Sequence, residues 1–150
     1  MNAPVLHIEN LSVSYLTEQG RLLALRHVSL SVPQGKIIGI VGESGCGKST
    51  LIASIMRLLA PNARVEGGSI AFKGADLLNL PRDDMRLLRG DEISMVFQDP
   101  MTSLNPVLTI GRQMSDVQHR SRSSRAEKTK RSLMMLERVG IPDPASQLKR

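Results

Sequence analysis

Aromatic side chains are almost missing from this chain of 150 residues. They make up 2% of it, with one tyrosine, two phenylalanines and no tryptophan. A hydrophobic core must therefore be built from aliphatic side chains and methionine. Hydrophobic residues make up 41% of the chain and charged residues 23%, which is the balance of a globular protein and not of a disordered one. The length is that of one ordinary domain.

Cysteine is equally scarce, since Cys46 is the only one, and this excludes an internal disulfide. No stretch approaches the roughly 18 apolar residues that a membrane span needs, and no basic segment leads into an apolar run at the N-terminus. These absences predict a cytoplasmic protein that can still dock against a membrane protein. The net charge of +6 suits an anionic ligand but selects none.

Alternation of apolar and polar residues predicts two antiparallel strands in the first third of the chain. The first covers residues 5–15, with a slip in phase that marks a bulge at Asn10. A turn at residues 18–21 leads into the second strand, at about residues 22–32. One face of this sheet is expected to stay partly exposed.

The next segment, residues 36–41, is apolar on both faces and predicts a buried parallel strand. A glycine-rich loop follows it, and a helix is expected from Lys48 until Pro61 stops it. Further along, the sequence predicts two short strands, at residues 69–73 and 93–97, and between them a helix at about residues 82–89. A loop is predicted at residues 99–106.

The last third of the chain predicts helix. Ser124 is expected to cap a helix at its start, and Glu127 completes a capping box. Gly140 stands where a helix ends, with Pro142 just beyond. The apolar stripe of this helix consists of Ala126, Leu133, Leu136 and Val139. The basic residues between positions 120 and 131 predict a solvated helix face and no nucleic-acid partner, because no aromatic residues interleave with them.

The glycine-rich loop fits the pattern G-x-x-x-x-G-K-[ST] at every fixed position. It consists of Gly42, Glu43, Ser44, Gly45, Cys46, Gly47, Lys48, Ser49 and Thr50. Glycines let the backbone wrap a phosphate, and the turned N–H groups and the positive end of the following helix meet its charge. Lys48 is expected at the β- and γ-phosphates, and the Ser49 hydroxyl on magnesium. The loop therefore predicts a site for ATP with Mg²⁺. Cys46 is interpreted as a small residue at a free position of the loop, the alternative being a reactive thiol.

Two features outside the loop make the chain resemble an ABC-type ATPase. Tyr15 ends the first strand, as an aromatic A-loop residue does, and Gln98 follows the apolar segment 93–97, as a Q-loop residue does. The closer resemblance is to the ATP-binding subunits of peptide (oligopeptide, dipeptide) and nickel importers. It spans essentially the whole chain and is carried by residues 42–50, 96–106 and 140–144.

The resemblance implies an α/β P-loop NTPase fold of the ABC type. It has an N-terminal antiparallel β-subdomain, a partial RecA-like core and the start of a helical subdomain. Residues of about 1–98 would form the β-subdomain and partial core, and residues of about 99–150 the Q-loop and helical segment. In this family Tyr15 would stack on adenine through its ring, and Lys48 and Gln98 would be catalytic. Ser49 and Gln98 would approach the magnesium ion.

The resemblance also implies a function and partners. The parent protein would couple ATP hydrolysis to import of peptides or nickel, at the cytoplasmic face of the inner membrane. Its partners would be transmembrane permease subunits, a second identical or different ATP-binding subunit and, indirectly, an extracytoplasmic substrate-binding protein.

Three family features are absent from residues 1–150: the Leu-Ser-Gly-Gly-type signature, a Walker B strand that ends in Asp-Glu, and a switch histidine. We expect the chain to be the first part of a nucleotide-binding domain, cut within its helical subdomain and unable to turn over ATP alone. Two alternatives stay open, a fragment that only binds nucleotide or is not functional, and a soluble ABC ATPase that acts outside transport.

Overall fold

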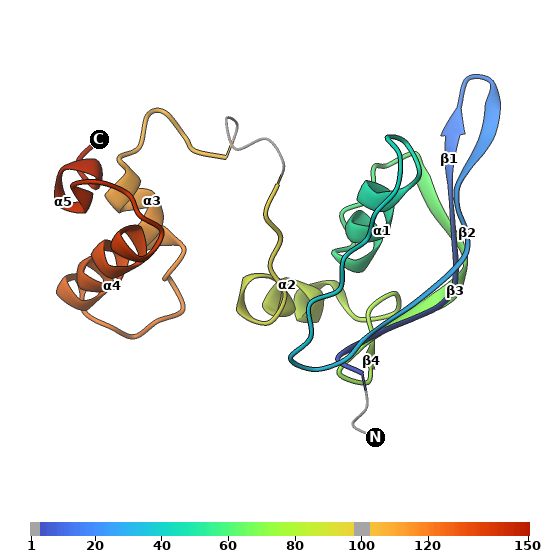
Figure 1. The fold of residues 1–150 in the computed structure, drawn as a ribbon, viewed down its shortest axis with the longest axis horizontal. Coiled ribbons are helices and arrows are strands. Elements are labelled where there is room, and N and C mark those ends of the chain that lie inside the picture. Colours follow the sequence, from blue (N-terminus) through green and yellow to red (C-terminus); the bar gives the residue numbers. More distant parts are fainter. Residues whose placement is uncertain (1–3, 98–102) are drawn as a thin grey trace. The chain divides into compact units, whose positions relative to one another are not determined.

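The computed structural model describes residues 4–97 and 103–150, and Figure 1 shows the course of the chain. The chain divides into two compact units, Met1–Met95 and Val96–Arg150. No helix within the described ranges is long and apolar enough to span a membrane.

The first unit is built on a four-stranded antiparallel sheet in the order β2-β1-β3-β4. The strands are β1 (Leu6–Thr17), β2 (Gly20–Val32), β3 (Ala63–Phe72) and β4 (Ala75–Asp76). The two strands predicted in the first third, and the turn between them, are confirmed. The prediction for the third strand placed its start too late, because Gly67 and Gly68 lie inside β3 and not ahead of it.

The predicted bulge at Asn10 is also confirmed. The pairing of β1 with β2 shifts register between Ile8 and Leu11, and Asn10 has a φ of 50°. Gly68 of β3, with a φ of 93°, lies against this bulge: a Cβ atom there would come within 2.6 Å of the Asn10 carbonyl and of the Glu9 oxygen. Glycine is therefore required at position 68 both by the backbone conformation and by the close approach of β1.

Helices α1 (Lys48–Ile55) and α2 (Arg82–Asp91) share one hydrophobic core with the sheet, and Figure 1 shows α1 beside it. Leu51 of α1 and Met85 of α2 are both buried in that core. The sheet and its flanking turns contribute Ile8, Leu11, Val13, Leu25, Ile70, Phe72 and Leu77. The core is aliphatic apart from Phe72, as the composition predicts.

Helix α1 is shorter than predicted, because the chain turns away from helical geometry at Arg57, where φ is 49°. Arg89 closes this end of α1: its Nε donates to the Met56 carbonyl at 2.8 Å and its guanidinium also donates to the Arg57 carbonyl at 2.9 Å. The helical course of α2 is broken at Arg89, with ψ of 126°, and at Gly90, with φ of 91°. The kink lets one arginine satisfy two carbonyls at the end of another helix.

Two predicted strands do not form. Residues 36–41 have no regular structure, and Ile37 and Val41 are 99% and 94% exposed. At residues 93–97 only Ile93 makes a bridge, to Arg89, and Val96 is 96% exposed. Both predictions are wrong for the same physical reason. A parallel strand needs a neighbouring strand to accept its hydrogen bonds, and no described strand pairs with either segment.

The second unit contains α3 (Ile110–Asp116), α4 (Arg125–Arg138) and α5 (Pro144–Gln147). The predicted start of α4 is confirmed, because the Ser124 side chain accepts from the Glu127 amide and the Glu127 carboxylate accepts from the Ser124 amide. The predicted end is confirmed as well. Gly140 has a φ of 77°, and the amide of Ile141 donates to the Leu136 carbonyl at 2.9 Å.

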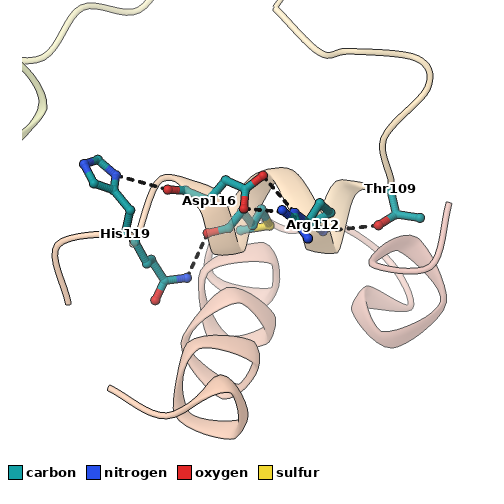
Figure 2. A network of polar contacts seen from close by, with 6 residues as sticks. Thr109, Arg112, Asp116 and His119 are labelled. Atoms are coloured by element: carbon teal, nitrogen blue, oxygen red, sulfur yellow. Dashed lines mark hydrogen bonds and ion pairs between the residues drawn. The ribbon is translucent and has the colours of Figure 1, made fainter. Parts of the chain in front are cut away.

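Polar contacts fix α3 within this unit, as Figure 2 shows. The Thr109 hydroxyl caps the helix by accepting from the Arg112 amide at 3.2 Å, and the Arg112 side chain lies 3.0 Å from the Asp116 carboxylate. The Gln118 side chain joins α3 to α4 by donating to the carbonyl of Met114 and to Ser132. The three histidines, His7, His27 and His119, are exposed.

Candidate functional site

The glycine-rich loop of residues 42–50 is shaped by glycines in left-handed conformations. Gly45 and Gly47 have φ values of 80° and 99°. A Cβ atom on Gly47 would lie 2.8 Å from the Ala24 carbonyl oxygen and 2.8 Å from a Leu25 methyl group, so the end of the loop rests directly on β2. Gly42 begins the loop, and a Cβ atom there would approach Cys46 Sγ at 2.7 Å. The left-handed conformations of Gly45 and Gly47 therefore require glycine for the turn, and Gly47 also for the contact of the loop with the sheet.

The ammonium group of Lys48 lies on the backbone of the loop. Its Nζ donates to the carbonyls of Gly42 and Glu43, both at 2.6 Å, and lies 3.3 Å from Cys46 Sγ. An ammonium has three donors and no acceptor, so these contacts account for all three. The Lys48 ammonium therefore lies at the centre of the loop of residues 42–50, where its charge acts on any anion that the loop holds.

Helix α1 begins within the same motif. Gly47 is its N-cap residue, no side chain caps this end, and the first helical hydrogen bond runs from the Leu51 amide to the Gly47 carbonyl at 2.9 Å. The N-terminal end of a helix has a partial positive charge and N–H groups that point away from the helix. Ser49 is exposed in this first turn. Positive charge, N–H groups and a hydroxyl thus meet at one place, which is suited to a phosphate chain.

Cys46 is exposed and lies beside Lys48. The hydrogen bond from the Lys48 side chain lowers the pKa of the Cys46 thiol below its ordinary value, and backbone hydrogen bonds and the lysine charge act in the same direction. Neighbouring cations favour the thiolate form, which is the nucleophile. The motif alone favours a small residue at a free position, but this geometry gives the alternative of a reactive thiol a physical cause.

The reactivity of Cys46 gives a testable pH dependence. Because the pKa of its thiol is lowered, the thiolate should form at lower pH than in an ordinary cysteine, and the midpoint of alkylation by iodoacetamide should shift to lower pH accordingly. In Lys48→Ala the midpoint should move back upward. Rates measured between about pH 6 and pH 10 bracket the usual thiol pKa, with glutathione as the reference thiol. Identical midpoints in the two proteins would show that Lys48 does not control Cys46.

Tyr15 lies at the other side of the motif. It is half-buried near the end of β1, and its hydroxyl lies 3.3 Å from the Thr50 hydroxyl in the first turn of α1. The structure thus brings Tyr15 next to the predicted phosphate loop, although 35 residues separate it from Thr50. In the sequence, Thr50 is only the last position of the motif, and no pattern indicates this contact. Alternating strands do not reveal which helix their buried side chains will meet.

Gln98, the second predicted catalytic residue, lies outside the described residues, and so does Asp99. Part of the distinctive run 96–106 is described after this gap. Gln113 of α3 holds it, because its side chain accepts from the Asn105 amide at 2.9 Å and donates to the carbonyls of Asn105 and Leu108 at 3.0 and 2.9 Å. Gln113 could not be identified from the sequence, because the contact depends on the fold of a turn that no pattern specifies.

The chain is similar in sequence to ABC transporter proteins. A sequence profile described as ABC transporter matches residues 25–150. The dipeptide transport ATP-binding protein DppD of Bacillus subtilis is 49% identical over 148 residues, and the oligopeptide transport ATP-binding protein OppD of Escherichia coli is 41% identical over 146 residues. Each alignment covers 97% of this chain but only 44% and 43% of the respective relative. The chain therefore spans less than half the length of these relatives.

Solved structures of ATP-binding cassettes also superpose on this chain. A dimeric ATP-binding cassette in a post-hydrolysis state, bound to ADP and phosphate, superposes with a TM-score of 0.81 at 26% identity, covering 96% of this chain and 61% of that one. A dimeric bacterial ABC transporter cassette superposes with a TM-score of 0.75 at 27% identity, covering 88% of this chain and 56% of that one.

Proposed function

Because the chain belongs to the ABC transporter family, we propose that it is the ATP-binding portion of an importer subunit that couples ATP hydrolysis to uptake of dipeptides or oligopeptides. Nickel is the second candidate substrate, because residues 96–106 resemble the corresponding segment of peptide and nickel importer subunits. The observation that carries the proposal is the loop of residues 42–50, with Lys48 centred on it and the start of α1 behind it. The two relatives named above are described as dipeptide and oligopeptide transport proteins, which supports a peptide substrate.

In this proposal each part of the site meets one part of the nucleotide. Tyr15 stacks on adenine, the loop amides and Lys48 hold the phosphates, and the Ser49 hydroxyl binds magnesium. The described residues contain no group of three or more His, Cys, Asp or Glu side chains that could hold a metal ion alone. Mg²⁺ is usually held by few protein oxygens together with substrate phosphates. Magnesium, when bound, neutralises charge on the phosphates. Gln98 is proposed to orient the attacking water.

The proposed partners follow from the same assignment. They are transmembrane permease subunits, a second ATP-binding subunit and, indirectly, a substrate-binding protein, at the cytoplasmic face of the membrane. The test is uptake of a labelled dipeptide, a labelled oligopeptide and nickel by cells from which the gene for this chain has been deleted. Loss of peptide uptake supports the proposal, loss of nickel uptake alone redirects it to nickel, and full retention of all three contradicts it.

The expectation that residues 1–150 alone do not turn over ATP makes a separate prediction. We expect a polypeptide of residues 1–150 to show no steady-state ATP hydrolysis above background. Hydrolysis needs a positioned water, a held metal and stabilisation of the charge that develops on the γ-phosphate. These residues offer Lys48, Ser49 and Gln98, but no acidic residue that closes an apolar strand and no signature sequence to complete a neighbour's site.

Phosphate release in the presence of magnesium measures this directly, with Lys48→Ala as the control. Robust release that the control abolishes would show that a carboxylate within residues 1–150 supports the reaction, and Asp99 would be the first one to replace.

A further inference from the structure

The hydroxyl groups of Tyr15 and Thr50 join the strand that carries the predicted adenine-stacking ring to the helix that begins at the phosphate loop. They lie 3.3 Å apart and both residues are half-buried. A hydrogen bond at the far end of a phenol ring limits the rotamers that the ring can occupy. The contact therefore bears on where the ring is placed relative to the phosphates.

The Tyr15 end of this contact is rigid. Tyr15 belongs to the central strand β1, where it is paired with Leu22 of β2 on one side and with Ala63 of β3 on the other. The next residue, Leu16, is held again, because its amide donates to the Asn62 carbonyl at 2.8 Å and its carbonyl accepts from the Asn62 side chain at 3.0 Å. The backbone below the ring is thus fixed on both sides, and the side-chain torsions of Tyr15 remain the main freedom.

The Thr50 end is equally well held. Thr50 lies in the first turn of α1, two positions after Lys48, and the next residue, Leu51, is buried in the core. The Thr50 carbonyl accepts from the Ser54 hydroxyl at 2.7 Å. Gly47, at the N-cap, is pressed against β2. A group on this turn therefore keeps a constant distance to the loop that would hold the phosphates.

We propose that Thr50 is a positioning residue for base recognition, whose hydroxyl holds the Tyr15 ring at the place where it stacks on the adenine of a nucleotide bound by the loop. The inference rests on the proposed function. Functional side chains bind best when neighbouring contacts fix their rotamers on rigid elements. The family resemblance implies a role for the ring of Tyr15, and the contact with Thr50 adds a role for its hydroxyl, so Tyr15→Phe should lose part of the selectivity for the base.

The chain itself supplies the probe for this inference. It has one tyrosine and no tryptophan, so its intrinsic ultraviolet fluorescence reports on Tyr15 alone. Titration with Mg-ATP and with inorganic tripolyphosphate gives two affinities, and their ratio measures recognition of the nucleoside apart from any contact of Thr50 with phosphate. Thr50→Val removes the hydroxyl at nearly constant shape, and Thr50→Ser is the conservative variant that keeps it.

We expect Thr50→Val to reduce the preference for ATP over tripolyphosphate by about three- to tenfold, the range that the loss of one hydrogen bond gives, and Thr50→Ser to restore most of it. Tyr15→Phe, measured by calorimetry, should show a similar loss, and the double variant Tyr15→Phe/Thr50→Val should add little, because both changes remove the same contact. Far-ultraviolet circular dichroism confirms that each variant is folded. Unequal spectra of Tyr15 in Thr50→Val and Thr50→Ser would report the same contact without ligand.

The outcomes separate this inference from the proposed function. A ratio unchanged in Thr50→Val, or losses that add in the double variant, would overturn the positioning role while nucleotide binding stands. Equal affinity of the unaltered chain for ATP and tripolyphosphate would likewise overturn it, and would leave only the phosphate site. An unaltered chain that binds neither ligand would overturn the proposed nucleotide site and this inference with it.

Discussion

Replacing Lys48 with alanine is expected to weaken ATP binding at least about a hundredfold, which means its practical loss. The ammonium now bonded to the carbonyls of Gly42 and Glu43 is the positive side chain centred on the loop. Hydrogen bonds to charged groups contribute about 1.5–3 kcal/mol each, and the phosphates would lose the two or more that the ammonium would make to them in exchange for these carbonyls. Equilibrium binding of a fluorescent ATP analogue in the presence of magnesium measures the effect.

Lys36→Ala is the matched control for this variant. It removes the same charge from an exposed turn ahead of the loop, so it reports the effect of net charge alone. We expect its affinity for the analogue to stay close to that of the unaltered chain. Equal affinities in Lys48→Ala and Lys36→Ala would show that the loop of residues 42–50 does not hold the phosphates.

The second large effect concerns stability. Gly68→Ala is expected to lower the free energy of unfolding by about 2–6 kcal/mol, because a left-handed backbone and an overlap with packed atoms each cost about 1–3 kcal/mol. Gly68 has a φ of 93°, and its added Cβ would lie 2.6 Å from backbone atoms of Glu9 and Asn10. Those atoms belong to the central strand and cannot move away as a flexible side chain could. Urea denaturation followed by circular dichroism gives the free energy.

The neighbouring glycine provides the control. A Cβ atom on Gly67 would meet no atom within 4 Å, and its φ lies outside the left-handed range. Gly67→Ala should therefore leave the stability unchanged or raise it by about 0.5–1 kcal/mol, the usual difference between alanine and glycine within a strand. If both variants are equally destabilised, the close approach of β1 and β3 at the bulge is not what requires glycine.

The fold class was predictable from the sequence because its signals are local. The loop and its flanking segments predicted a P-loop domain, and the ABC-type fold implied by the family resemblance of residues 42–50, 96–106 and 140–144 is confirmed by the similarity to solved ATP-binding cassettes. Asn10 disturbs an otherwise regular alternation, and Ser124 with Glu127 forms a capping box within four consecutive residues. Each of these features is decided by neighbours in the chain, so a pattern can identify it.

The errors arose where structure depends on distant partners. Residues 36–41 have the composition of a buried strand, but composition cannot supply the neighbouring strand that such a segment needs. Likewise, the motif identified Lys48 and the loop, while the contact between Tyr15 and Thr50 depends on how β1 and α1 pack. The role of Gln98 stays a prediction, since it lies outside the described residues.

The kink in α2 couples the position of α2 to that of α1, which begins at the loop. Arg89 donates to the carbonyls of Met56 and Arg57, which directly follow the last residue of α1, while Gly47 and Thr50 attach its first turn to the sheet. Helix α1 is thus held at both ends, by the sheet at its start and by α2 at its end. If α2 moves, α1 must move with it unless both hydrogen bonds of the Arg89 guanidinium break. A lysine at position 89 would weaken this coupling, because a single ammonium lacks the planar fork that spans two oxygens.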